Sequence, residues 1–256
     1  MTILLTREGG CAVLTLNRPE ALNALSFDIL GQIAEALDTV AGWRDIRALL
    51  ITGAGDKAFC AGADIRELRN RTLADQRHGA ELGQAVFARL DRLPVASVAL
   101  VNGYAFGGGA ELAMACTFRL AGPHAVFGLP EIKLGLIPGY GGTQRLPRLV
   151  GEARALEIIM TGRNVPADEA ARIGLVTALV DGDLLAAGQD FARRFTRFSL
   201  PVLKLAREAV QRAGDLPLHE GLRMEADLST LAYRTADAEE GMAAFEEKRP
   251  PEFRDG

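Results

Sequence analysis

One acidic residue stands alone in a long apolar stretch. Glu111 is the only charged residue between Val95 and Cys116, and its neighbours on the expected helix are alanine, leucine and methionine. A carboxylate in apolar surroundings is costly unless it is paired, hydrogen-bonded or protonated, and a solvated helix face would carry more polar residues. The pattern indicates a functional carboxyl. The alternative is a structural glutamate that reaches solvent or pairs with a distant arginine.

Glycines precede Glu111 at the start of the same expected helix. Gly107, Gly108 and Gly109 place free backbone amides at the positive end of that helix, where an oxyanion is favoured. A second glycine-rich entry, residues 139–143, again places amides before a helix. Its alternative interpretation is close helix packing.

A second carboxyl, Glu131, follows Pro130. Proline and an acidic residue also suit the first turn of a helix, so this position alone is ambiguous. The sequence lacks HExxH, GxSxG, GxxxxGK[ST] and GxGxxG. Two carboxyls, two sets of amides and no metal or nucleophile motif suit proton transfer at a carbon next to a carbonyl, where amides would stabilise an enolate oxygen.

The segment from Lys57 to Arg66 could bring its backbone close to a ligand. Ala61, Gly62 and Ala63 are small enough to allow that approach. The alternative is a plain turn in which Asp64 caps a short helix.

Composition limits the possible functions. The chain has 256 residues, a net charge of −4 and three widely spaced cysteines. The negative charge disfavours nucleic-acid binding, no apolar run approaches the roughly 20 residues of a membrane span, and the cysteines fit neither a disulfide framework nor a zinc site. The first residues lack the features of a signal or transit peptide. We therefore expect a reduced, cytoplasmic protein.

The elements that must position these residues alternate between strand and helix. Apolar runs predict strands, and helical spacing with capping residues predicts helices. The chain turns all-helical from residue 184, with breaks near 199–201 and 214–217. This order predicts an α/β core with a packed helical appendage. The expected strands are 3–5, 12–16, 47–52, 95–101, 118–121, 125–127 and 175–180; the expected helices are 26–41, 73–93, 107–116, 139–150, 152–160 and 167–172, with a loop at 56–64.

Together these motifs resemble the enoyl-CoA hydratase/isomerase (crotonase) family, and within it the enoyl-CoA hydratases. The matching segments are Leu16–Pro19, Leu22–Leu25, Ala58–Ile65, Ala99–Leu112, Phe127–Gly135, Pro138–Leu146 and Glu240–Arg249. The resemblance covers nearly the whole chain. It implies a ClpP-like spiral of repeated ββα units over residues 1–197 for CoA binding and catalysis, and a helical region over 198–256 for assembly and covering the active site.

The resemblance also implies a ligand and its contacts. An acyl-CoA thioester would place its carbonyl oxygen in an oxyanion hole formed by the amides of Ala63 and Gly108. Glu111 and Glu131 would be the catalytic residues. No separate cofactor or metal is implied, since CoA enters with the substrate, and a homo-trimer or homo-hexamer would be usual. The residues expected to bind CoA or substrate are Lys57, Ala61, Ala63, Asp64, Ile65, Arg66 and Gly108.

The pair of glutamates matches the hydratase pattern, because related isomerases generally keep one carboxylate. The expected reaction is reversible syn addition of water to a trans-2-enoyl-CoA, giving a 3-hydroxyacyl-CoA. The alternatives are an enoyl-CoA isomerase, a hydratase of a dicarboxylic or aromatic-pathway enoyl-CoA, a non-catalytic acyl-CoA-binding subunit, or an RNA-binding relative. Chain length and pathway, fatty-acid β-oxidation among them, stay open.

Overall fold

The computed structural model describes all 256 residues, which form two compact units, Met1–Asp190 and Phe191–Gly256. The first unit is built on two sheets. Its larger sheet has the strand order β1-β2-β3-β5-β7-β10, in which β1 and β2 are antiparallel and the other neighbours are parallel. The central strands are almost wholly buried, as expected for a sheet covered on both faces. The bounds are β1 Ile3–Glu8, β2 Cys11–Leu16, β3 Ala48–Gly53, β5 Ala96–Val101, β7 Phe118–Ala121 and β10 Ala178–Leu179.

The smaller sheet carries the residues of interest at one edge. Its order is β4-β6-β8-β9, with β4, β6 and β8 parallel and β9 antiparallel. Because parallel strands end at the same edge, the segments that follow β4, β6 and β8 lie close together. The strands are β4 Ala58–Cys60, β6 Tyr104–Phe106, β8 Val126–Gly128 and β9 Val165–Pro166.

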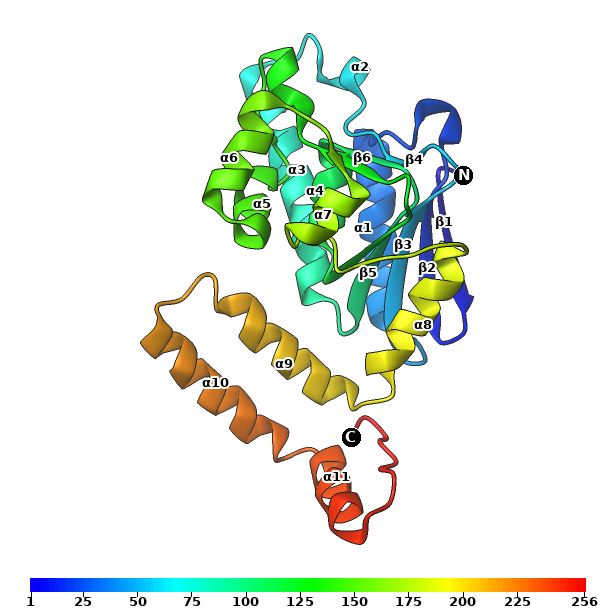
Figure 1. Ribbon diagram of the computed structural model, residues 1–256, viewed down its shortest axis with the longest axis vertical. Helices are drawn as coiled ribbons and strands as arrows, with labels where there is room; N and C mark the ends of the chain where they lie inside the picture. Colours follow the sequence, from blue (N-terminus) through cyan, green and yellow to red (C-terminus); the bar gives the residue numbers. More distant parts are fainter. The chain divides into compact units, whose positions relative to one another are not determined.

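The chain alternates between the two sheets in a repeated pattern. A strand of the larger sheet is followed by one of the smaller sheet and then by a helix or helical turn, as in β3–β4, β5–β6 and β7–β8. The predicted ββα repeat and α/β fold are confirmed. Figure 1 shows α3, α5 and α6 gathered on one side of this unit and β1 and β2 on the other. Its helical segments are η1 Pro19–Ala21, α1 Phe27–Gly42, α2 Ile65–Leu68, α3 Leu73–Arg92, α4 Gly108–Ala115, η2 Pro130–Leu134, α5 Gly142–Val150, α6 Glu152–Thr161 and α7 Ala167–Arg172.

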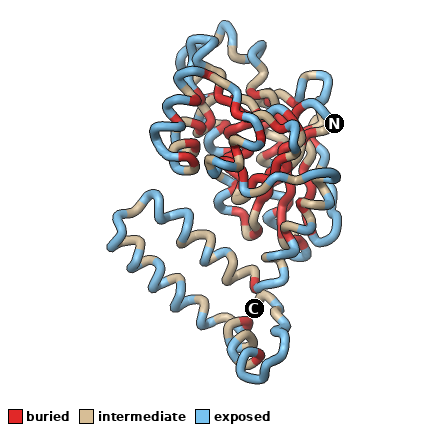
Figure 2. Tube along the Cα trace, in the orientation of Figure 1, coloured by how far each residue is buried: buried red, intermediate tan, exposed pale blue.

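The second unit is entirely helical, with a C-terminal tail. Helix α8 (Leu184–Thr196) crosses the boundary between the units, and α9 (Leu200–Arg212), α10 (Leu218–Ala232) and α11 (Ala236–Glu247) follow. Buried residues are concentrated in the first unit and sparse in the second (Figure 2). None of the helices combines the length and apolar character that a membrane crossing requires.

Several expected elements differ from the structure: the strand expected at 3–5 extends to Glu8, and strands β6 and β9 were not expected. The expected loop at 56–64 contains strand β4, whose three residues are fully apolar and buried. The expected strand at 175–180 is reduced to two residues. The helix expected from residue 139 begins at Gly142, because Gly141 has a left-handed φ of 113°, which no right-handed helix continues.

Candidate active site

Glu111 lies on α4 and is held by a turn that is distant in sequence. Its side chain is buried, with the residue only 1% exposed. Oε1 accepts hydrogen bonds from the backbone amides of Tyr140 at 2.8 Å and Gly142 at 2.7 Å. Both hydrogen bonds end on Oε1, so Oε2 is left to interact with a ligand. The amides of the second glycine-rich entry therefore bind a carboxylate of the protein itself.

The surroundings of Glu111 bring its proton equilibrium close to neutral pH. The pKa of its carboxyl is raised from 4.5 to about 7; burial and the charge of Glu131 raise it, whereas the two amides and Arg145 lower it. A carboxyl with a pKa near neutrality can both take and release a proton at low energetic cost.

Glu131 lies on η2, directly after β8, and its carboxyl approaches the start of α4. A Cβ built on Gly107 would lie 3.0 Å from its Oε1, so glycine leaves the room that this carboxyl uses. Its Oε2 is buried and has no hydrogen-bond partner. Burial raises the pKa of Glu131. A buried carboxyl oxygen that no protein group satisfies is well placed to bind a polar ligand atom.

The amide of Ala63 faces away from its own strand pairing. Ala63 forms a parallel bridge with Leu25, in which Leu25 donates to the Gly62 carbonyl at 2.8 Å and accepts from the Asp64 amide at 2.7 Å. In a parallel bridge the residues on either side, here Gly62 and Asp64, make both hydrogen bonds to Leu25. The N–H of Ala63 therefore points away from Leu25.

The amide of Gly108 opens α4 and so has no acceptor within the helix. The two amide-bearing loops are adjacent: a Cβ on Gly62 would lie 3.1 Å from the Phe106 carbonyl and 3.7 Å from the Gly108 nitrogen. Gly62 and Gly107 both adopt positive φ, which favours glycine at these two positions. Two free amides and two carboxyls thus meet at one edge of the smaller sheet.

Other residues expected at the site have varied surroundings. The amide of Ala61 donates to the Leu22 carbonyl. Asp64 caps α2 and forms a 3.0 Å ion pair with Arg18, so its carboxylate is already engaged. Ile65 and Arg66 are exposed on α2, beside Ala63.

Lys57 is not brought together with these residues. It precedes β4, whereas Ala63 follows that strand. Lys57 lines a surface hollow together with Tyr104 and His124. Its expected contact with CoA stays a prediction.

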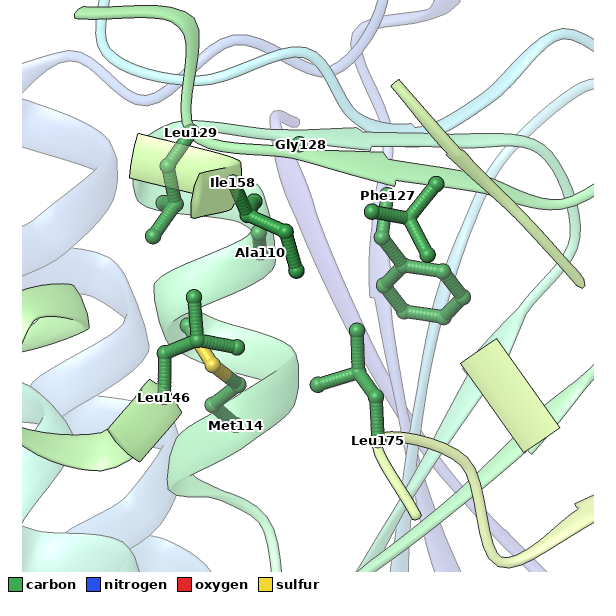
Figure 3. Close-up of a pocket in the computed structure, with 9 residues that line it drawn as sticks. Ala110, Met114, Phe127, Gly128, Leu129, Leu146, Ile158 and Leu175 are labelled. Atoms are coloured by element: carbon green, nitrogen blue, oxygen red, sulfur yellow. The ribbon is translucent and has the colours of Figure 1, made fainter. Parts of the chain in front are cut away.

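A neighbouring face of α4 packs into the apolar core. Ala110 and Met114 face Phe127, Leu146 and Leu175 around a small void (Figure 3). Its volume is about 10 Å³ and it has no polar lining atom, so it offers nothing to bind a substrate. This packing fixes the helix that carries Glu111.

The comparisons with known proteins agree over the full chain. Residues 6–256 match the family model described as enoyl-CoA hydratase/isomerase. A short-chain-enoyl-CoA hydratase of Clostridium acetobutylicum is 40% identical over 96% of this chain and 95% of its own. A crotonyl-CoA hydratase of Syntrophomonas wolfei is 42% identical over 98% of this chain and 97% of its own.

A solved structure gives the same result. The crystal structure of an enoyl-CoA hydratase from Bacillus anthracis superposes with a TM-score of 0.95 at 37% identity, over 100% of both chains. The protein described here has the crotonase fold and belongs to the enoyl-CoA hydratase/isomerase family.

Proposed function

We propose that this protein is an enoyl-CoA hydratase, which adds water reversibly and with syn geometry to a trans-2-enoyl-CoA. The observation that carries this proposal is the convergence of two carboxyls, the buried Glu111 and the half-buried Glu131, beside two free amides. Full-length relatives named as enoyl-CoA hydratases support it. A protein that only bound acyl-CoA would have no use for a carboxyl pair with raised pKa values.

The substrate's thioester oxygen would accept hydrogen bonds from the amides of Ala63 and Gly108. Negative charge develops on this oxygen as water attacks C3, so donors fixed in advance stabilise the transition state. The loss of one such donor typically costs about 3–4 kcal/mol in the barrier. The acyl-CoA would pass Ala61, Asp64, Ile65 and Arg66 as it enters.

The two carboxyls would share one proton through the cycle. Ionised Glu111 takes a proton from the water whose oxygen bonds to C3, and protonated Glu131 gives its proton to C2. The cycle closes when a proton returns from Glu111 to Glu131, so that one water is consumed and the enzyme is unchanged. One shared proton is the expected state for two neighbouring carboxyls whose pKa values are both raised by burial, with the charge of Glu131 also raising the pKa of Glu111.

A homo-trimer or homo-hexamer is the proposed assembly, built through residues 198–256. Exposed apolar side chains on this part of the chain support it. They are Val210, Leu218, Leu222, Leu231, Tyr233, Met242 and Phe245. The cytoplasmic location expected from the sequence stays a prediction.

The direct test is a hydration assay with crotonyl-CoA, which follows loss of the conjugated enoyl-thioester absorbance. We expect rapid loss and 3-hydroxybutyryl-CoA as product. No loss, together with conversion of a 3-enoyl-CoA to its 2-enoyl isomer, would replace the hydratase by an isomerase. Activity confined to enoyl-CoAs with a second carboxylate would instead identify a hydratase of dicarboxylic intermediates.

A further inference from the structure

A cation lies beside the turn that holds Glu111. Residues 140–142 provide the two amides that bind the Glu111 carboxylate, and their conformation includes the left-handed Gly141. The Tyr140 carbonyl in this turn accepts a 3.2 Å hydrogen bond from Nη1 of Arg145, one turn along α5. Arg145 thus binds the same short segment that binds Glu111.

The guanidinium of Arg145 lies directly against this turn. A Cβ built on Gly141 would lie within van der Waals overlap of Arg145 Nη1, so the cation occupies the space that a side chain would need. Nη2 of Arg145 forms a 3.7 Å ion pair with Asp91 of α3, and the Arg145 side chain is only 22% exposed. The cation is therefore fixed from α3 on one side and contacts the turn on the other.

We propose that Arg145 is a positioning residue for Glu111, which fixes the 140–142 turn so that both amides meet the carboxylate and which supplies positive charge that keeps this carboxylate ionised. The inference rests on the proposed hydration, in which ionised Glu111 acts on water. Arg145 touches neither substrate nor water in this account and acts through the turn and its charge.

Other titratable groups surround Glu111 and Arg145. Glu131 and the Tyr140 phenol face Glu111, and Asp91 and the Cys116 thiol face Arg145. Arg145 lowers the pKa of Glu111, in opposition to burial and to the charge of Glu131. Removal of this cation must therefore raise the pKa of Glu111. Activity that requires ionised Glu111 declines as pH is lowered, and this acid-side decline must then begin at a higher pH.

The test compares the pH dependence of kcat/KM in Arg145→Met, Arg145→Lys and wild type. Arg77→Met is the matched control, because Arg77 is an exposed cation on α3 paired only with Glu81 of the same helix. We expect the acid limb in Arg145→Met to move upward by about half a pH unit and kcat/KM to fall about tenfold. Arg145→Lys should keep the acid limb of the wild type, and Arg77→Met should match the wild type throughout.

The outcomes separate a positioning role from a structural one. An Arg145→Met enzyme with lowered thermal stability but a wild-type acid limb would overturn the inference, as would an Arg145→Lys limb that moves as far as that of Arg145→Met. If Arg145→Met does not fold, Arg145→Gln replaces it in the same comparison with Arg145→Lys. A wild type that hydrates no enoyl-CoA would instead refute the proposed function, and this inference with it.

Discussion

The burial of Glu111 has a cost to folding. Its carboxyl is buried, and its pKa is raised from 4.5 to about 7. The unfolded chain therefore loses this proton at a lower pH than the folded protein does. Between those two pH values the unfolded state binds fewer protons, so the free energy of unfolding falls as pH rises. Above about pH 7 the folded protein bears the full cost of burying the ionised Glu111 carboxylate. Below the pKa of Glu111 in the unfolded chain this cost is absent.

Glu111→Gln should for this reason make the protein more stable at alkaline pH. The side-chain carbonyl oxygen of glutamine can accept the hydrogen bonds from the amides of Tyr140 and Gly142, and it carries no charge. We expect the free energy of unfolding at pH 8 to increase by about 2–3 kcal/mol, and the difference from wild type to shrink towards zero near pH 4.5. Urea denaturation across this range measures it, with the exposed Glu246→Gln as control. A stability difference that does not vary with pH would refute this account of Glu111.

The sequence marks the two candidate carboxyls more clearly than the groups that bind them. Glu111 was detectable because a lone charge in an apolar stretch is unusual. The donors to its carboxylate were not, because they are main-chain amides of Tyr140 and Gly142, 29 and 31 residues away. Backbone donors leave no side-chain signature, and only the fold brings them to Glu111.

At the scale of elements, three parallel strands bring the site together. Ala63, Gly108 and Glu131 follow β4, β6 and β8 by two or three residues. The contact between α4 and β4 is especially close: a Cβ built on Gly109 would overlap the Cys60 carbonyl. This approach sets the distance between the loops that carry Ala63 and Gly108.

Gly109→Ala should consequently disturb both the fold and the oxyanion hole. The new methyl must push α4 away from β4, so we expect a loss of roughly 2–4 kcal/mol in stability and at least a tenfold loss in kcat. Gly31→Ala is the matched control, because its Cβ on α1 meets nothing within 4 Å. It should stabilise the protein by about 0.5–1 kcal/mol. Denaturation and hydration rates measure both; equal behaviour of the two variants would contradict the close contact.

Long elements were predictable, and of the three-residue strands only β8 was expected, at 125–127. Helices α1 and α3 have caps and regular apolar spacing, and both match the expected ranges closely. Strands β4 and β6 have three residues each, too few to show a period. They are strands because neighbouring strands of the smaller sheet pair with them, which is a tertiary effect.

At the scale of the whole molecule, the second unit exposes more apolar surface than an isolated chain would favour. Phe245 is 84% exposed on α11, and Leu218 is 78% exposed on α10. Contiguous exposed apolar residues typically mark protein interfaces, in agreement with the proposed assembly.

The mass in solution tests that assembly. We expect three or six times the 27.3 kDa of one chain by light scattering. Phe245→Asp should shift the population towards smaller species, because a charge would be buried in the interface. Glu225→Ala, at an exposed polar position on α10, should leave the mass unchanged. A monomeric wild type would refute the trimer and hexamer alike.

The most direct test of the account measures hydration and substrate binding separately in Glu111→Gln and Glu131→Gln. If the carboxyls move protons while the amides of Ala63 and Gly108 hold the thioester, each variant should lose at least a hundredfold in kcat. Affinity for a CoA thioester should stay within a few-fold of wild type. Wild-type kcat in either variant would remove that residue from the mechanism, and loss of binding without loss of kcat would contradict the division between carboxyls and amides.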